Sequence, residues 1–278
     1  MDVERLLPPV TYQGGKQRLA AEIVKRMAVP RSAIFYDLCC GSGAVSIALV
    51  ESGHPPDQIV MVDQGWWGAF WRRIGDGGFD MRRFRKYVDD LPTDPRQIKT
   101  RVEEWYRAPV DPIDGIYVWL LLQAAAIGGA PVASCDGRWR RNSGFRDYWL
   151  PTMTSSRRSP VNPMMPMPAT IIKRVEALMS GMRGVRGIDG DAAYLAHETR
   201  RVLKSVVYID PDYAGTTGYG HSLDPVKLAK SLPCPCWVSE GTPLSKDAVR
   251  LSTGRAKGGM TGGRKRAANE EWLSRLGG

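Results

Sequence analysis

The chain of 278 residues lacks a long apolar run. Its longest, from Ile116 to Ile127, covers about a dozen residues and falls short of the roughly 20 that a membrane-spanning helix needs. The first residues, Met1 to Arg5 followed by prolines, have neither the positive start nor the apolar stretch of a secretion signal. These absences argue against membrane and secreted proteins, and we expect a cytoplasmic protein with no membrane partner.

Cysteine and histidine are scarce, with five and three residues respectively. Cys39 is adjacent to Cys40, and one residue separates Cys234 from Cys236, so neither pair has the spacing of a disulfide framework or of zinc ligands. The histidines add no ligand pair, standing far apart at His54, His197 and His221. We therefore predict no metal site, and reduced thiols that are mostly small core residues.

Acidic residues are outnumbered, 29 against 39 Lys and Arg, which gives a formal charge of +10 and a pI near 9.5. This excess favours a polyanionic partner, because Lys and Arg gain affinity for phosphates by releasing counterions. The hydrophobic fraction of 43% is that of a globular protein. The length suits one catalytic domain with an accessory lobe.

Short apolar segments alternate with helical ones. Four are typical of strands buried on both faces: Ala33–Leu38, Gln58–Val62, Val206–Ile209 and Cys236–Ser239. Helices are predicted at Gln17–Met27, Ala44–Ser52 and Val226–Leu232, the last capped by Asp224-Pro225. This alternation predicts an α/β protein with a doubly wound, mostly parallel sheet.

The pattern changes between Trp66 and Gly190, where helices are expected near Met81–Val88, Arg96–Tyr106, Ile113–Ile127 and Thr170–Met182. We interpret residues 66–189 as an inserted, mainly helical lobe, and residues 1–65 with 190–278 as the catalytic, cofactor-binding domain. Residues 269–273, Asn-Glu-Glu-Trp-Leu, could close the sheet.

The first predicted strand ends in Asp37-Leu-Cys-Cys-Gly41-Ser-Gly43 and passes directly into a helix. Glycines there let the backbone approach a ligand at the carboxyl edge of a sheet. Asp63 ends the next strand, 63 − 43 = 20 residues after the last glycine, where a carboxylate could accept both ribose hydroxyls. Because the third glycine of a dinucleotide turn is missing, S-adenosylmethionine fits better than a pyrophosphate cofactor. An ordinary tight turn is the alternative.

A second motif, Asp210-Pro211-Asp212-Tyr213, follows the strand Val206–Ile209. It resembles the Asp-Pro-Pro-Tyr motif of amino-methyltransferases. With Tyr12-Gln-Gly-Gly-Lys16 and the Asp37–Gly43 turn, in the same order along the chain, the sequence resembles the Dam-type (D12 class) family of adenine-N6 DNA methyltransferases. The resemblance implies a class I S-adenosylmethionine methyltransferase fold whose inserted lobe recognises double-stranded DNA. Separately from the resemblance, we expect a monomer.

The resemblance also implies roles for single residues. Asp210 and the carbonyl of Pro211 would accept the two hydrogens of a flipped adenine's amine, and Tyr213 would stack on the base. Cofactor contacts are expected from eight residues: Tyr12, Lys16, Asp37, Gly41, Gly43, Asp63, Asp191 and Asp210. A solvated lysine is the alternative for Lys16, and a loop cap for Asp191.

Three departures from the family stand out. Asp212 replaces the usual proline, and Leu38-Cys39 replaces Pro-Phe. Residues 123–133 lack the Asn, Arg and Tyr common in enzymes that read GATC, and we therefore do not assign GATC as the target.

Basic residues interleaved with aromatics predict DNA contacts by Arg138, Arg140, Arg141 and Arg146. The alternative is a surface strand with a buried Trp. Residues 250–266 predict a loop laid against DNA through Lys257, Arg264, Lys265 and Arg266, or else a disordered hairpin tip.

The expected activity is S-adenosylmethionine-dependent methylation of adenine N6 in DNA. Two alternatives stay open. The motif recognises an exocyclic amine but does not specify the base, so the same fold could methylate cytosine N4 or RNA. A DNA-binding protein impaired in catalysis by Asp212 is the other.

Overall fold

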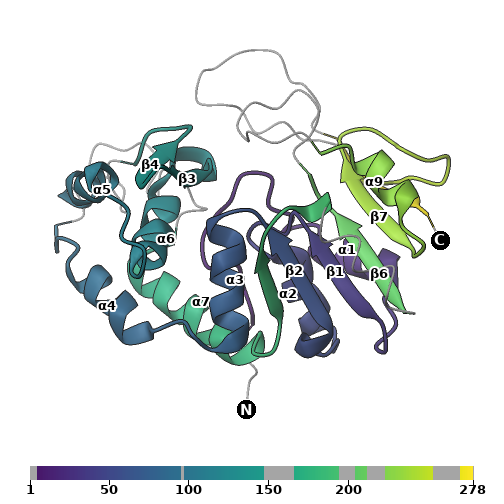
Figure 1. Cartoon of the computed structure of the whole chain (residues 1–278), viewed down its shortest axis with the longest axis horizontal. Coiled ribbons are helices and arrows are strands. Elements are labelled where there is room, and N and C mark those ends of the chain that lie inside the picture. The colour runs from purple at the N-terminus through teal and green to yellow at the C-terminus, as the bar shows by residue number, and fades with distance from the viewer. Residues whose placement is uncertain are drawn as a thin grey trace.

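The computed structural model describes residues 5–94, 97–146, 166–193, 204–211, 223–252 and 270–277. Within them lies a seven-stranded sheet in the order β5-β2-β1-β6-β7-β9-β8 (Figure 1). Its strands are β1 Ile34–Leu38, β2 Ile59–Asp63, β5 Arg186–Asp189, β6 Ser205–Ile209, β7 Cys236–Glu240, β8 Val249–Ser252 and β9 Glu271–Leu276. The first five in this spatial order pair in parallel, and β9 runs antiparallel to both β7 and β8. The predicted α/β class with a mostly parallel sheet is confirmed.

The central strands are apolar because both faces of the sheet are covered. On β1, Phe35 belongs to one core, whereas Tyr36 and Leu38 belong to the other. The first core contains apolar side chains of α1 Ala20–Met27, α2 Ala44–Glu51 and α3 Trp66–Asp76. The second is closed by α9 Pro225–Ser231, whose N-cap Asp224 accepts the N–H of Lys227 as its sequence predicts. Two covered faces explain why the strands have continuous apolar runs.

A helical lobe continues the first core away from the sheet (Figure 1, left). Its elements are α4 Met81–Asp89, α5 Ile98–Arg107, α6 Gly115–Ala125, α7 Pro168–Gly181 and the hairpin β3 Val132–Cys135 with β4 Arg138–Arg141. Short 3-10 turns lie at Pro56–Gln58 and Ile127–Gly129. Every residue of α6 is buried, so this helix is the centre of the lobe.

The predicted boundaries of the insert, 66 and 189, are wrong at both ends, because α3 and β5 belong to the sheet domain. β5 pairs with β2, and α3 lies so close to β5 that a Cβ on Gly75 would stand 1.8 Å from the carbonyl oxygen of Val185. A Cβ on Gly187 would stand 2.0 Å from the backbone nitrogen of Arg72. Glycines on both elements therefore allow helix and strand to touch through their backbones.

The thiols and the helices bear on two further expectations. All five cysteines are free; Cys234 and Cys236 are buried as predicted, but Cys39 and Cys40 are half-buried and Cys135 is exposed. Among the described residues, no helix is long and apolar enough to cross a membrane. In the same residues, no three His, Cys, Asp or Glu side chains are grouped to hold a metal ion.

Candidate functional site

A cavity of about 1180 Å³ opens at the carboxyl ends of the parallel strands. From β1 the chain proceeds to β2 and β5 on one side and later returns to β6 on the other, so the switch of direction lies between β1 and β6. Ligands of open α/β sheets bind at such a point. The Asp37–Gly43 turn follows β1 and Asp210-Pro211 follows β6, which brings both motifs to this cavity.

The two glycines of the turn have different surroundings. Both have positive φ, +47° at Gly41 and +72° at Gly43, a conformation that favours glycine. A Cβ on Gly41 would stand 3.0 Å from the ring of Tyr12 at the cavity wall, whereas one on Gly43 would stand 2.3 Å from the ring of Trp71. Gly41 lines the cavity and Gly43 instead admits a core tryptophan beneath the turn.

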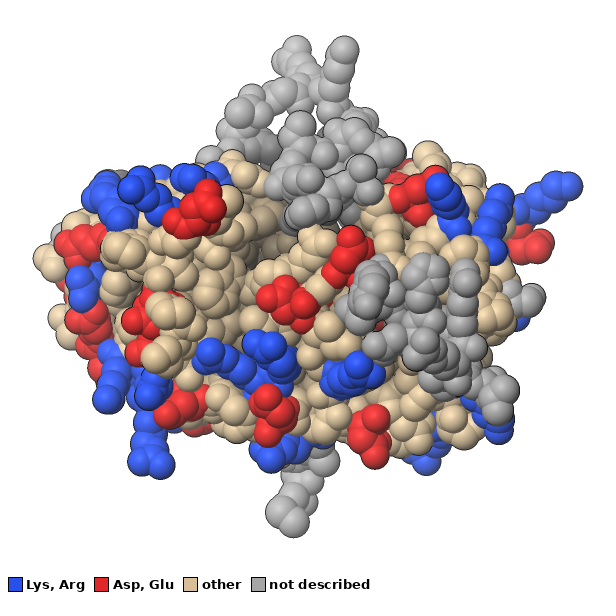
Figure 2. Space-filling model, viewed as in Figure 1, with Lys and Arg blue, Asp and Glu red and all other residues tan. Residues whose placement is uncertain are grey.

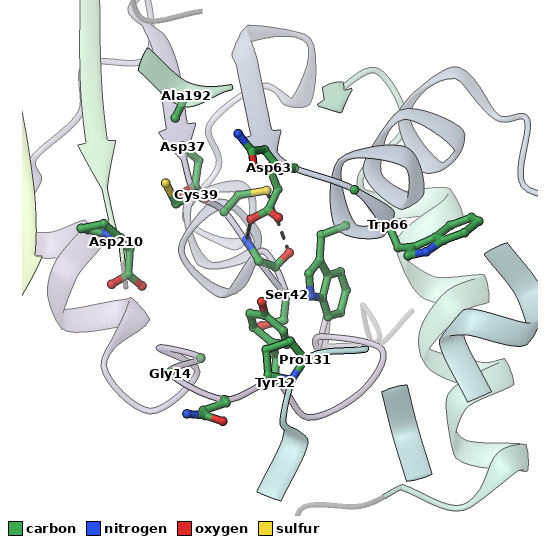
Figure 3. A pocket seen from close by; sticks show the side chains of 18 of the residues that line it. Tyr12, Gly14, Asp37, Cys39, Ser42, Asp63, Trp66, Pro131, Ala192 and Asp210 are labelled. Atoms are coloured by element: carbon green, nitrogen blue, oxygen red, sulfur yellow. Dashed lines mark hydrogen bonds between the residues drawn. The ribbon is translucent and has the colours of Figure 1, made fainter. Parts of the chain in front are cut away.

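Asp63 ends β2 beside the turn and fixes its shape. Its Oδ2 accepts the N–H of Gly41 at 2.7 Å, while the ring nitrogen of Trp71 donates to the carbonyl of Gly41 at 2.9 Å. The predicted ribose acceptor is therefore also a brace of the glycine turn. Figure 3 shows Asp63 and Asp210 reaching the cavity from different strands.

Asp37 is enclosed, with 1% of its surface exposed, yet it lines the cavity. Burial raises its pKa to about 7, although the Ser46 hydroxyl, which donates to Oδ2 at 2.6 Å, opposes the shift. Asp37 is thus a carboxyl group that changes charge close to neutral pH.

Lys16 is not a solvated lysine, since its side chain is only 6% exposed. Its Nζ lies 2.7 Å from Asp210 Oδ1, 3.6 Å from Glu271 Oε1 and 3.1 Å from the carbonyl of Gly14, to which it donates. Burial lowers the pKa of Lys16, but the two carboxylates outweigh burial and raise it above its usual value. Lys16 is therefore an ammonium held between two acids.

Asp210 is the catalytic carboxylate predicted from the sequence. Burial raises its pKa, and Lys16 acts against that rise. Pro211 is buried beside it and lines the same cavity. Asp212 and Tyr213 lie outside the described residues, as do Lys257, Arg264, Lys265 and Arg266.

Two further predicted cofactor residues line the cavity. Tyr12 packs edge-on against Trp67 with ring centroids 5.3 Å apart. Asp191 is exposed at the rim and accepts the N–H of Ala193 at 2.7 Å. The loop-cap alternative for Asp191 is thus confirmed, and its place at the cavity leaves a cofactor contact open.

The four arginines predicted on the lobe divide into two pairs. Arg138 and Arg140 are exposed on β4, and Arg140 also lines the cavity. Arg141 forms an ion pair with Glu103 at 2.9 Å, and its guanidinium lies over the rings of Tyr106 and Phe145.

The side chain of Arg146 is half-buried, and burial lowers its pKa. The first pair is available to a ligand. Arg141 is instead held by Glu103 and two rings, and Arg146 donates to the carbonyl of Ala126 at 3.5 Å. Trp139, between the exposed arginines, is buried, so the surface strand with a buried Trp is what β4 forms.

Sequence reasoning missed several residues at this cavity. Trp66 begins α3, packs on Trp139 with ring centroids 5.4 Å apart and donates to Ser134 Oγ at 3.1 Å, which fixes the hairpin to the sheet domain. Glu240 lines the cavity at the end of β7, and Glu271 meets Lys16 from β9. A missed signal was Asp136-Gly137, the dipeptide of a two-residue hairpin, which has positive φ at both positions here.

Charge is unevenly distributed over the site. Of the described residues lining the cavity, two are basic, Lys16 and Arg140, and five are acidic: Asp37, Asp63, Asp191, Asp210 and Glu240. Figure 2 shows basic side chains gathered at the upper left, over α5 and the hairpin, and acidic ones nearer the centre of the same face. The cavity therefore suits a cationic ligand, whereas the margin of the lobe suits an anionic one.

Comparison with models of known protein families gives no match, and comparison with curated proteins gives none either.

Proposed function

We propose that the protein transfers a methyl group from S-adenosylmethionine to N6 of adenine in DNA. The observation that favours this function is the meeting of three predicted features in one cavity at the switch point of the sheet: the Asp37–Gly43 turn, Asp63, and Asp210-Pro211. They come from three strands and are separated by up to 173 residues, 210 − 37 = 173.

The cavity has properties that fit this cofactor. Its volume of about 1180 Å³ leaves room for a nucleoside-sized cofactor and a flipped base together. Its acidic lining would attract the sulfonium and ammonium groups of S-adenosylmethionine and repel a pyrophosphate. Tyr12, Gly41, Asp63 and Asp191 would hold the cofactor, which supplies an activated methyl group when bound.

The arrangement of the sheet supports the same proposal. In this sheet the parallel strands are followed by a last strand, β9, which is inserted antiparallel between β7 and β8. The same arrangement is expected of the class I methyltransferase fold. In that fold the first strand and the strand carrying the tetrapeptide are neighbours, as β1 and β6 are here.

The side chains at Asp210 are suited to an amine substrate. An exocyclic amine on a purine is a weak nucleophile because its lone pair is conjugated with the ring. The Asp210 carboxylate and the Pro211 carbonyl can accept its two hydrogens and so hold the lone pair toward the methyl donor. Lys16 supports this role, since its positive charge favours the ionised form of Asp210.

The DNA part of the proposal rests on the charge of +10 and on the hairpin. Arg138 and Arg140 are exposed beside the cavity, where they would meet phosphates next to a flipped nucleotide. Tyr213 would stack on that base.

The proposal is tested by incubating the purified protein with S-adenosylmethionine and mixed-sequence double-stranded DNA, then analysing the digested nucleosides by mass spectrometry. We expect N6-methyladenine. Detection of N4-methylcytosine would instead indicate a cytosine-N4 methyltransferase. Methylation of an RNA substrate alone would indicate an RNA methyltransferase. Measurable binding of cofactor and DNA with no methylated nucleoside would instead favour the DNA-binding protein.

The assay needs a variant that separates catalysis from folding. Asp210→Asn should lower the rate by about a hundredfold or more, since it removes the charged acceptor of the amine. Its DNA affinity should change little. Asp247→Asn, an exposed acid on the same domain, serves as the matched control and should retain full activity. Full activity of Asp210→Asn would mean that another group accepts the amine.

A further inference from the structure

Helix α6 is apolar along most of its length, but near its end it carries Gln123, which is 1% exposed. Its amide nitrogen donates to the carbonyls of Gly129 at 3.2 Å and Ala130 at 3.1 Å. Its amide oxygen accepts the N–H of Val132 at 3.0 Å. A buried amide needs such partners, and all three belong to the connection from α6 into β3. Gln123 therefore holds this connection in place from within the core of the lobe.

The carbonyl of Gly129 has a second donor from a distant part of the chain. It accepts the N–H of Gln13 at 2.9 Å, so Gln123 and Gln13 donate to the same oxygen. The backbones are close here: a Cβ on Gly129 would stand 3.1 Å from the carbonyl oxygen of Thr11 and 3.2 Å from the nitrogen of Gln13. The lobe thus touches the amino-terminal segment directly at Gly129.

Gln13 lies within the Tyr12–Lys16 segment, which contributes two side chains to the candidate site. Tyr12 lines the cavity (Figure 3), and Lys16 reaches Asp210 at 2.7 Å. The segment is a tight turn, closed by the N–H of Gly15, which donates to the carbonyl of Tyr12 at 3.1 Å. In so short a turn, a displacement at Gln13 is passed to both neighbouring side chains.

We infer that Gln123 is a positioning residue of the cofactor site: through the carbonyl of Gly129 it sets where the Tyr12–Lys16 segment lies at the cavity. The inference deepens the proposed function and rests on its cofactor. A role confined to the structure of the lobe would need only the bonds to Ala130 and Val132. The oxygen shared with Gln13 carries the effect to the site, so the recognition lobe helps to determine affinity for the cofactor.

The test compares the two glycines of the 3-10 turn Ile127–Gly129. Both have φ of +72°, so alanine strains the backbone at either position. A Cβ on Gly128 would meet no described atom within 4 Å, whereas one on Gly129 would press on the amino-terminal segment. We expect affinity for S-adenosylhomocysteine, measured by calorimetry, to fall about fivefold or more in Gly129→Ala, the equivalent of one hydrogen bond. Gly128→Ala should match the unmodified protein.

Affinity for DNA, measured without cofactor, separates positioning from a general loss of structure. Gly129 is not part of the β3–β4 hairpin, whose exposed arginines are proposed to bind DNA. Gly129→Ala should therefore bind labelled DNA as the unmodified protein does while its affinity for S-adenosylhomocysteine falls. Both titrations are made at a temperature at which denaturation curves show the two variants to be folded.

A second pair of variants acts on the amide itself. Gln123→Met keeps an unbranched side chain of similar length and removes the amide. Tyr117→Phe is its control, because it removes a buried hydroxyl of the same helix that accepts the N–H of Asp80 at 3.2 Å and does not line the cavity. Gln123→Met should weaken S-adenosylhomocysteine binding, and Tyr117→Phe should leave it unchanged. This pair decides the matter if Gly129→Ala does not fold.

The outcomes separate this inference from the proposed function. An unmodified protein that binds S-adenosylhomocysteine, with Gly129→Ala and Gln123→Met binding it equally well, would overturn the role of Gln123 alone. So would an equal loss in Gly128→Ala, or a loss of DNA affinity in Gly129→Ala as large as the loss for S-adenosylhomocysteine. An unmodified protein that does not bind S-adenosylhomocysteine would overturn the proposed function and this inference with it.

Discussion

At the scale of single residues, the site is built from groups whose charge depends on burial. Asp37 is the clearest case, since it is enclosed, has the Ser46 hydroxyl as a donor and has a pKa of about 7. The usual value for an aspartate is about 3.9. The folded protein therefore holds a proton on Asp37 over a pH range in which the unfolded chain has lost it.

The stability contributed by Asp37 should fall as pH rises from about 4 to about 7, because the folded state binds the additional proton there. The total loss is about 4 kcal/mol for a shift of roughly three pKa units. Asp37→Asn removes this dependence while keeping an acceptor for Ser46. We expect it to gain stability over the unmodified protein at pH 8 and much less at pH 5, as measured by urea denaturation. A gain that is the same at both pH values would contradict the assignment.

The same residue should tie cofactor affinity to pH. Above pH 7 Asp37 is ionised and attracts a cationic ligand, so affinity for S-adenosylmethionine should rise between pH 6 and pH 8. Calorimetric titration of Asp37→Asn should give weaker binding with a smaller change over this range. An affinity of the unmodified protein that falls as pH rises would argue against a cationic ligand at Asp37.

At the scale of elements, the contact between α3 and β5 depends on glycine. Gly75→Ala should destabilise the protein by about 3 kcal/mol, because the added Cβ overlaps the carbonyl of Val185. In an exposed helix the same change would stabilise by about 1 kcal/mol, so the sign is diagnostic. Gly144→Ala, whose Cβ would meet Ile127 at 3.5 Å, is the control and should change little. The denaturation midpoints of both variants are compared with that of the unmodified protein. A Gly75→Ala variant more stable than the unmodified protein would mean that α3 and β5 separate readily.

The same elements show where prediction from the sequence succeeds. Strands β1, β2, β6 and β7 are mostly apolar and are bounded by turns, so every end of these strands was predicted to within one residue. Residues 269–273, predicted to close the sheet, do contribute to it through β9, but β9 lies between β7 and β8, and β8 forms the edge.

Other elements gave weak or ambiguous signals. α3 contains Gly68 and Gly75, which lower helix propensity and are explained only by the neighbouring strand. β5 is four residues long, includes Gly187 and has exposed ends, so it has no apolar run. The positions of α3 and β5 therefore depend on tertiary contacts that the local sequence does not show.

The candidate site likewise has features that the sequence predicts and features that it does not. The turn and the Asp210 motif were predictable because they follow strands directly. Neither the burial of Lys16 nor its second partner Glu271 has a local signal, since the three groups meet only through the order of the sheet.

At the scale of the whole molecule, acids line the cavity and exposed arginines stand on the lobe beside it. Arg140→Ala should weaken DNA binding and reduce the slope of log affinity against log salt by about one, because one phosphate contact is lost. Arg26→Ala, on α1 and paired with Glu22, is the control and should leave the slope unchanged. Titration of labelled DNA at several salt concentrations measures both. Equal slopes for Arg140→Ala and the unmodified protein would mean that the hairpin is not part of the DNA interface.

The position of β9 has a consequence for folding. Glu271 and Lys16 are separated by 271 − 16 = 255 positions, so their contact closes one of the longest loops that the chain can form. Lys16 and Asp210 can meet once β1 and β6 are paired, but the corner gains its second carboxylate only when β9 has joined the sheet. An intermediate that lacks β9 would lack this contact of Lys16, so the corner of the cavity around Asp210 would be completed last.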